Sequence, residues 1–351
     1  MIYFLIVLML ILISYVITGS GNEYLSSKFF MIFSFICILF LYIFKDNSIF
    51  PDLDNYEILF QNSRLVSWNR VSELQNYLIT DKYEIGWCCY TKFFSSISDD
   101  FSLLIFATAF LYLCCFWILI KRYSKYLLFA VVLFVILRFY NSCFILRQNM
   151  AVAICVLSIP YIENRKPIQF ALTILVASLF HQSAIVFSIM YFLYNVSINK
   201  KYIISVVIIT LVLYLGVLAI LNNIVQYIEY YQSYIVENRT EQGSNYTAGF
   251  LSLISVCFLF LVYKNKTLDK RTTLFIHALV ISSIINIIKV GMPGTVGRLA
   301  LYFTAFQVII IPNACKTITD TSYRIMAVLF FFVLYFVLFY STLNYGFELK
   351  I

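Results

Sequence analysis

The chain has 351 residues, of which 62% are hydrophobic and only 12% are charged, and its formal net charge is +8. Its mean hydropathy of +0.89 lies far above the range of soluble proteins and excludes a soluble globular domain. The basic residues lie mainly in short turns between apolar runs, where they set membrane orientation, so nucleic-acid binding is not predicted. The nine cysteines include no CxxC pair, and neither a disulfide framework, a metal site nor a cofactor site is expected.

Apolar runs long enough to cross a membrane recur along the chain. The first run lacks the basic start and the small-residue cleavage site of a signal peptide, so we expect a retained helix. The predicted spans cover residues 2–18, 28–44, 101–120, 126–145, 148–162, 202–221, 248–263, 273–289, 298–315 and 323–342.

Residues 167–198 decide the topology. A single tilted helix here would place the basic turns at 200–201 and 264–271 outside, against the positive-inside rule. Two short helices broken at His181 place both turns in the cytoplasm. We therefore predict an all-α polytopic membrane protein with about 12 transmembrane helices, forming a single integral membrane domain over residues 1–351 with both termini outside.

The break at His181 should lie within the membrane. A helix from Pro167 to Phe180 covers about 20 Å, which is less than the roughly 30 Å of the hydrocarbon core. His181 should therefore lie below the outer surface, where a helix break is tolerated only if it is buried in protein or lines a watery cavity.

Two extracytoplasmic loops are predicted. The first, residues 45–100, is too long to be structureless, and Val71, Leu74 and Leu78 fall on one helical face, so we expect interfacial helices over the mouth of a cavity. The second, residues 222–247, is rich in tyrosine, which suits an aromatic belt or, as an alternative, the stacking of sugars.

Polar residues that the topology brings to the outer side form a candidate site. The long loop opens with Asp52, Asp54 and Tyr56 and closes with Glu84 and Trp87. Competing explanations are an Asx-turn after Pro51 for the two aspartates, and an ion pair of Glu84 with Lys82 or Lys92.

Two arginines could form a diphosphate clamp at the same side. Arg147 begins the fifth span, where free helix N–H groups favour an anion, and Arg298 follows a glycine-rich turn at the start of another span. A guanidinium binds phosphate oxygens bidentately and keeps its charge, although an arginine at a helix end can also be a snorkelling anchor. His181 has a functional and a structural explanation, whereas His277 is expected to be structural, and the deeper Arg138 is expected to pair with an acid or a carbonyl.

These groups suit a sugar transfer from a lipid diphosphate. Such a reaction needs stabilisation of the leaving group's charge and deprotonation of the attacking hydroxyl. Arginines can supply the first, and a carboxylate or a histidine can supply the second. No nucleotide-sugar domain or P-loop is visible, so the donor is expected to be a lipid rather than a nucleotide.

The ordered set of motifs resembles the EpsG family over residues 50–310 or so. The motifs are Asp54-Asn55-Tyr56, Glu84-Ile85-Gly86-Trp87, Leu146-Arg147-Gln148-Asn149-Met150-Ala151, Ala177-Ser178-Leu179-Phe180-His181-Gln182-Ser183-Ala184, and Gly297-Arg298-Leu299 with Tyr302. This family is associated with Wzy-type polymerisation of O-antigen, capsule or exopolysaccharide. The resemblance implies a GT-C-like, metal-independent glycosyltransferase of the bacterial inner membrane, whose active site faces the periplasm or the exterior.

The resemblance also implies roles for individual residues. The enzyme would move a growing glycan from undecaprenyl diphosphate onto a second lipid-linked repeat unit, with Arg147 and Arg298 binding diphosphate and His181, Asp54 or Glu84 acting as base. Substrate-binding residues would be Asp52, Tyr56, Trp87, Gln148 and Tyr302. The expected partners are lipid-linked repeat units, membrane lipid and, as a further candidate, a chain-length regulator protein.

Two other classes of function remain open at this stage. A flippase or transporter for the lipid-linked unit would be expected to show duplicated halves, and no internal repeat is visible. An O-antigen ligase or a membrane acyltransferase could also use a histidine and arginines.

Overall fold

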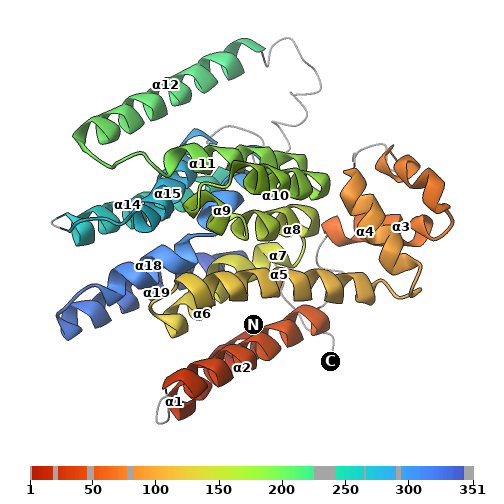
Figure 1. Ribbon diagram of the computed structural model, residues 1–351, viewed down its shortest axis with the longest axis horizontal. Coiled ribbons are helices and arrows are strands. Elements are labelled where there is room, and N and C mark those ends of the chain that lie inside the picture. Colours follow the sequence, from red (N-terminus) through yellow and green to blue (C-terminus); the bar gives the residue numbers. More distant parts are fainter. Residues whose placement is uncertain are drawn as a thin grey trace. The chain divides into compact units, whose positions relative to one another are not determined.

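Helices build the part of the chain that the structure describes (Figure 1). The structure is a computed structural model that describes residues 2–18, 23–45, 51–76, 83–224, 242–264, 266–289 and 294–343, and these ranges contain no strand. The predicted all-α class is therefore confirmed. The chain divides into a first unit, Met1–Ile185 with Val328–Ile351, and a second unit, Val186–Ala327.

The first unit is a layered arrangement of apolar helices in which α1 packs on α2, α2 on α5, α5 on α8 and α8 on α10. Because successive helices bury Leu, Ile, Val and Phe against one another, the core of this unit lies around α5 and α8. Its elements are α1 (Ile2–Thr18), α2 (Glu23–Phe44), α3 (Pro51–Ser63), η2 (Trp68–Asn76), α4 (Ile85–Ser95), α5 (Ser102–Tyr123), α6 (Leu127–Phe134), the π-helical turn η3 (Val135–Phe139), α7 (Tyr140–Ser142), α8 (Leu146–Val156), α9 (Ile159–Glu163) and α10 (Pro167–Phe180).

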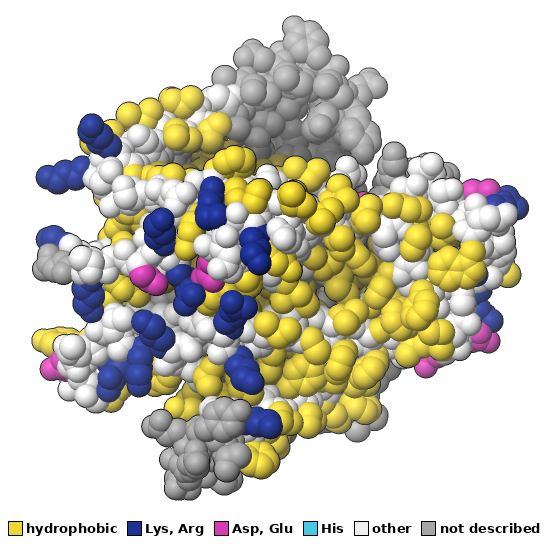
Figure 2. Space-filling model, in the orientation of Figure 1, with side chains coloured by type: hydrophobic (Ala, Val, Ile, Leu, Met, Phe, Trp, Pro, Cys, Tyr) yellow, Lys and Arg dark blue, Asp and Glu magenta, His cyan; other side chains and the backbone are white. Residues whose placement is uncertain are grey.

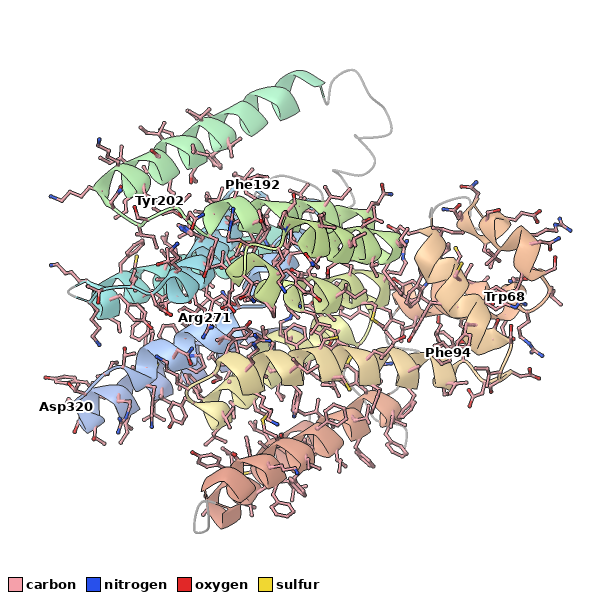
Figure 3. The ribbon with its side chains drawn as sticks, viewed as in Figure 1. Trp68, Phe94, Phe192, Tyr202, Arg271 and Asp320 are labelled. Atoms are coloured by element: carbon pink, nitrogen blue, oxygen red, sulfur yellow. The ribbon has the colours of Figure 1, made fainter. Side chains whose placement is uncertain are left out.

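The long predicted loop, 45–100, is largely helical, as expected, because it contains α3, η2 and α4. Figure 3 labels Trp68 on η2 and Phe94 on α4. Leu74 is fully buried, while Leu78 lies outside the described residues. Interfacial placement of these helices stays a prediction.

The beginning of α3 corrects one alternative. Asp52 and Asp54 lie in the first turn of the helix that starts at Pro51, and not in an Asx-turn. Proline suits the first helical position, and the helix dipole favours carboxylates in this turn.

α10 ends where the sequence predicts a break. Pro167 occupies its first turn, Phe180 is its last residue, and His181 has extended backbone angles, φ −158° and ψ 116°. A 3-10 helix, η4 (Gln182–Ser188), follows directly. The predicted break at His181 is therefore confirmed.

The second unit is organised around α15, which contacts α11, α12, α14, α17 and α18. His277 of α15 is fully buried, and its two ring nitrogens are paired with the Tyr202 hydroxyl, 2.7 Å away, and the Val196 carbonyl oxygen, 2.9 Å away. This confirms the structural role expected for His277; Tyr202 is labelled in Figure 3.

The elements of the second unit are α11 (Ile189–Leu193), α12 (Lys200–Ile224), α14 (Gln242–Tyr263), α15 (Lys270–Ile288), α16 (Gly294–Arg298), α17 (Leu301–Thr304) and α18 (Gln307–Lys316), followed by α19 (Thr321–Leu343), which continues into the first unit.

Among the described residues, Ser27–Phe44, α5 and α15 are long and apolar enough to cross a membrane, and the pair Val296–Thr304 and Gln307–Lys316, bent by 44°, could count as a fourth span. The predicted spans 126–145 and 148–162 are divided among shorter helices, whereas α12, α14 and α19 have 25, 22 and 23 residues. Figure 2 shows hydrophobic side chains over much of the visible surface, as expected for a membrane protein. The count of about 12 spans stays a prediction.

The predicted second loop, 222–247, falls mainly outside the described residues. Most of the tyrosines on which that prediction rests, Tyr227, Tyr230, Tyr231 and Tyr234, are among the residues that are not described, and the side chain of Tyr246 is not described either.

Candidate functional site

Glu84 lies at the centre of the candidate site because of how the chain enters α4. Two hydrogen bonds hold the preceding residue, Tyr83: its backbone N–H donates to the Gln75 carbonyl oxygen at 2.8 Å, and the Gln75 side-chain amide donates to the Tyr83 carbonyl oxygen at 3.3 Å. Glu84 is then the N-cap residue of α4, with extended backbone and no side-chain capping bond. Its carboxylate is therefore available for partners on other helices.

Those partners come from α8 and from the end of α10. Arg147 donates from Nη1 to Oε2 of Glu84 at 2.9 Å, and His181 Nδ1 lies 2.9 Å from Oε1. The backbone N–H of Gln182 also donates to Oε1, at 3.0 Å. The carboxylate is thus held by one cation, one imidazole and one amide.

The carboxyl group is kept ionised despite its burial. Its side chain is only 9% exposed, which by itself raises the pKa, but the hydrogen bond from His181 and the positive charge of Arg147 outweigh this and leave the pKa of Glu84 below its usual value. We conclude that the Glu84 side chain is a carboxylate at neutral pH.

The imidazole of His181 is oriented by its contact with Glu84. Because the Glu84 carboxylate is an acceptor only, this contact requires a proton on Nδ1 of His181. Nε2 has no hydrogen-bond partner among the described residues, and the side chain is 27% exposed. An imidazole oriented by a carboxylate, with its second nitrogen open, is a group that could accept a proton from a substrate when it is in the neutral form.

Arg147 is enclosed by aromatic rings as well as by Glu84. It lies in the first turn of α8, and its guanidinium carbon lies 4.6 Å from the ring centre of Tyr83 and 5.8 Å from that of Tyr56. The side chain is 14% exposed. Glu84 therefore compensates part of the positive charge that is predicted to bind diphosphate.

A buried polar cluster holds the start of α8 in place. The Arg138 guanidinium donates to the Asn149 amide oxygen at 3.1 Å and to the Tyr112 hydroxyl at 3.2 Å. Asn149 in turn donates to the carbonyl oxygens of Asn141 and Ile145, on the turn that leads into α8. Arg138 is predicted to pair with an acid or a carbonyl, and one of its partners is the carbonyl oxygen of the Asn149 side-chain amide. This contact helps to hold the turn that precedes Arg147.

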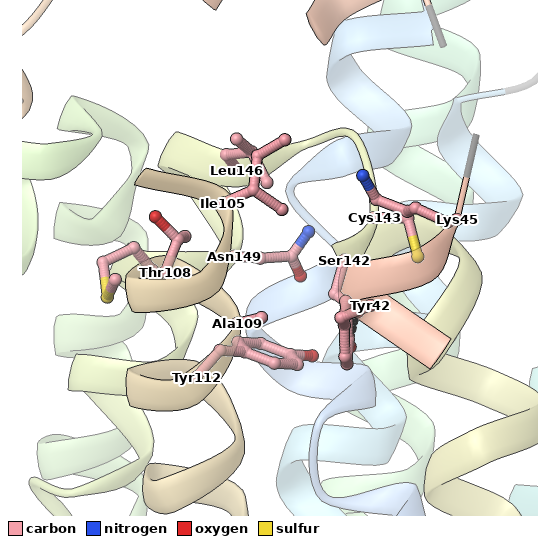
Figure 4. Close-up of a pocket in the computed structure, with 11 residues that line it drawn as sticks. Tyr42, Lys45, Ile105, Thr108, Ala109, Tyr112, Ser142, Cys143, Leu146 and Asn149 are labelled. Atoms are coloured by element: carbon pink, nitrogen blue, oxygen red, sulfur yellow. Dashed lines mark hydrogen bonds between the residues drawn. The ribbon is translucent and has the colours of Figure 1, made fainter. Parts of the chain in front are cut away.

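Figure 4 shows a small cavity beside this cluster, lined by Tyr42, Lys45, Tyr112, Ser142 and Asn149 among others. The hydroxyls of Tyr42 and Ser142 are hydrogen-bonded to each other across it. Its volume of about 10 Å³ suffices for about one water molecule, which is too little for a substrate. The cluster is therefore structural support and not a binding pocket.

Gly86 explains how α4 comes close enough to α10 for Glu84 to meet His181. A Cβ atom at Gly86 would lie 2.6 Å from the Leu179 carbonyl oxygen and 2.7 Å from the Leu179 Cβ. Only glycine permits that approach. Gly86 belongs to the motif Glu84-Ile85-Gly86-Trp87, and its role becomes visible only in the structure.

The remaining predicted residues of the first unit are distributed around the site. Tyr56 and Gln148 are buried, and Trp87 is fully buried against Tyr56, with ring centres 5.3 Å apart. These three side chains are buried and do not form an open surface. Asp52 is half-buried and Asp54 is exposed on α3.

The alternative pairing of Glu84 with Lys92 is wrong, because Lys92 donates to the Arg64 carbonyl oxygen. Lys82, the other alternative partner, lies outside the described residues.

Arg298 and Tyr302 belong to the second unit. Arg298 is exposed at the end of α16, while Tyr302 on α17 is fully buried. Lys289, at the end of α15, packs over Gly297, where a Cβ would lie 2.8 Å from the Lys289 Cδ and 3.4 Å from its Nζ. Lys289 is not among the predicted site residues, although its position just before the glycine-rich turn is a signal in the sequence.

Comparison with known proteins agrees with the motif resemblance. The EpsG family profile matches residues 28–349, which is nearly the whole chain and includes every residue of the candidate site. Comparison with curated proteins and with solved structures finds no match. Since the match extends from α2 to beyond α19, the chain belongs to the EpsG family.

Proposed function

We propose that this protein is a Wzy-type polysaccharide polymerase whose general base is His181, oriented by Glu84. Membership of the EpsG family supports a role in polysaccharide biosynthesis. The observation that carries the catalytic assignment is the 2.9 Å contact of His181 Nδ1 with the ionised Glu84 carboxylate, which leaves Nε2 open.

The reaction is a transfer of glycan from a lipid diphosphate to a sugar hydroxyl. The hydroxyl oxygen of the acceptor repeat unit attacks the anomeric carbon of the growing glycan, and its proton passes to Nε2 of His181. The bond between that carbon and the diphosphate oxygen breaks, and the electron pair leaves with the undecaprenyl diphosphate. The imidazolium that forms is stabilised by Glu84, since the carboxylate lies against its other nitrogen.

Cations that face the diphosphate are the second requirement. Arg147 remains a candidate, although its pairing with Glu84 means that it would share its charge between the carboxylate and the substrate. Arg298, which belongs to the second unit, remains a candidate from the sequence. The proposed location is the bacterial inner membrane with the site on the outer face, which the distribution of basic turns supports.

The decisive test is chain elongation in vitro on a synthetic lipid-linked repeat unit. His181→Ala should lower the turnover number about 10²- to 10⁴-fold, the usual contribution of a general base. Asp54→Asn is the matched control, because Asp54 is an exposed carboxylate on α3 and the third candidate base. Normal elongation by His181→Ala, or an equal loss in Asp54→Asn, would remove His181 as the base.

Experiments in cells separate this proposal from the other classes of function. In a strain lacking the gene, a polymerase defect leaves single repeat units on the final acceptor. Retention of repeat units in the cytoplasmic leaflet would instead indicate a flippase, and loss of even single units from the acceptor would indicate a ligase.

A further inference from the structure

A groove on the surface of the first unit has a mainly apolar lining that includes two lysines. It has a volume of about 400 Å³ and lies between α2, α5 and the start of α6. Its apolar lining includes Met31, Ile32, Phe35, Phe110, Trp117 and Ile118, and the polar lining consists of Ser27, Lys28 and Lys121. Ile32 and Ile118 are about half exposed, so the groove opens on the surface of the unit.

The two lysines lie at the same end of this groove because α2 and α5 are antiparallel. The Trp117 indole N–H donates to the Met31 carbonyl oxygen at 2.8 Å, and the Phe35 ring contacts both Phe110 and Trp117 at 5.7 Å. Lys28 is three residues before Met31, and Lys121 is four residues after Trp117. Both ammonium groups therefore extend past the apolar part, and both side chains are exposed.

The cationic end is far from the Glu84 site. Tyr90 of α4 contacts Thr108 of α5 at 3.2 Å, so the candidate site lies toward the first half of α5. Lys121 follows Thr108 by 13 residues, which is about 20 Å along a helix. Lysines at this distance cannot hold the diphosphate of a donor that reacts at His181.

We propose that the groove binds an anionic phospholipid of the leaflet opposite to the catalytic site, with its phosphate between Lys28 and Lys121 and an acyl chain along Phe35, Phe110 and Trp117. An apolar channel that ends in two ammonium groups is complementary to such a lipid. Two lysines favour an anionic over a zwitterionic headgroup, because the latter brings its own positive charge. The proposal is independent of the catalytic assignment.

The test is a lipid titration of the purified full-length protein, followed by native mass spectrometry. The probes are dioleoylphosphatidylglycerol and dioleoylphosphatidylcholine, which have the same acyl chains. Lys28→Gln/Lys121→Gln should weaken phosphatidylglycerol binding roughly tenfold to thirtyfold and leave phosphatidylcholine binding unchanged. Ile118→Trp, which fills the groove and keeps both lysines, should weaken the binding of both lipids.

Lys200→Gln/Lys201→Gln is the matched control, since it removes two exposed lysines from the beginning of α12. Equal affinity of the wild type for the two lipids would overturn the proposal, and so would an equal loss in both double variants. A third probe, undecaprenyl diphosphate, tests the other occupant. If Lys28→Gln/Lys121→Gln weakens its binding more than that of phosphatidylglycerol, the groove holds the carrier and not a phospholipid.

Discussion

The two carboxylate oxygens of Glu84 have different partners, and this division gives the residue two functions. Oε1 accepts from His181 and from the Gln182 backbone, which fixes the orientation of the imidazole. Oε2 accepts from Arg147, which keeps the carboxylate charged although it is largely buried. Loss of either contact would affect the other, because a buried carboxylate without its cation tends to take up a proton.

Replacement of Glu84 by glutamine should therefore be costly to catalysis. The amide has nearly the same shape, but it cannot stabilise an imidazolium or fix the proton on Nδ1. We expect the turnover number of Glu84→Gln to fall by about 10²-fold or more, while binding of the donor lipid changes less. Elongation kinetics at varied donor concentration measure the two effects separately.

Glu84→Asp provides the control for this prediction. It keeps the charge but shortens the side chain, so it should recover part of the turnover lost in Glu84→Gln. Equal turnover in Glu84→Gln and the wild type would show that the carboxylate does not act on His181.

The residues that could be identified from sequence are those whose chemistry is unusual for a membrane. Glu84, Arg147 and His181 are polar groups beside apolar runs, and all three are predicted site residues. Their mutual contacts could not be predicted, because Glu84 is 63 residues from Arg147 and 97 from His181, and no local pattern encodes such pairings. The simpler expectation, a pairing with the nearby Lys92, is wrong for the same reason.

Among the elements, the approach of α4 to α10 is the contact that assembles the site. It depends on the absence of a side chain at Gly86, because the atoms it would meet include the Leu179 backbone oxygen, which cannot move out of the way as a flexible side chain would.

Gly86→Ala should push α4 away from α10 and separate Glu84 from His181. We expect destabilisation of about 1–3 kcal/mol, the usual cost of overpacking, together with a large loss of elongation activity. Thermal unfolding and elongation assays on the purified protein measure both.

Gly216→Ala is a suitable comparison, because a Cβ there would meet nothing within 4 Å and the position is inside α12. Alanine should there stabilise the helix by roughly 0.5–1 kcal/mol. If both variants behave alike, the close approach at Gly86 is not what holds the site together.

The helix boundaries differ in how far the sequence determines them. The limits of α10 are visible because Pro167 can begin a helix and the polar His181 interrupts an apolar run. In contrast, α7 ends at Ser142, within a stretch that contains neither glycine nor proline. That break is set by packing and by hydrogen bonds such as those of Asn149, so the sequence does not show it. α8 ends at Val156, shortly before Pro160 in the first turn of α9, so a proline inside the predicted span 148–162 does mark that division.

For the molecule as a whole, the charge state of Glu84 links stability to pH. Its pKa is lower in the folded protein than the ordinary value of 4.5, so the carboxylate contributes stability that is fully present above the unfolded pKa. That contribution is lost as the pH falls through the folded value. Between pH 6 and pH 8, Glu84 should therefore have no effect on the pH dependence of stability.

Thermal unfolding of detergent-purified protein between pH 3 and pH 7 tests this. The wild type should have a higher melting temperature than Glu84→Gln at pH 7, and the difference should shrink as the pH falls below the ordinary carboxyl pKa of 4.5 and through the lower pKa of the folded state. Asp54→Asn, which removes an exposed carboxylate, should not show this convergence. A constant difference between wild type and Glu84→Gln at every pH would contradict the assignment of an ionised Glu84.

The sequence separations within the site also bear on how the protein is made. Glu84 leaves the ribosome well before either of its side-chain partners, since Arg147 follows 63 residues later and His181 follows 97 residues later. At a synthesis rate of about 5–20 residues per second, several seconds pass in which the acid has neither cation nor imidazole beside it. During this interval the lowest-energy state for Glu84 is in contact with water, so α4 should dock against the membrane domain only after α10 has been inserted.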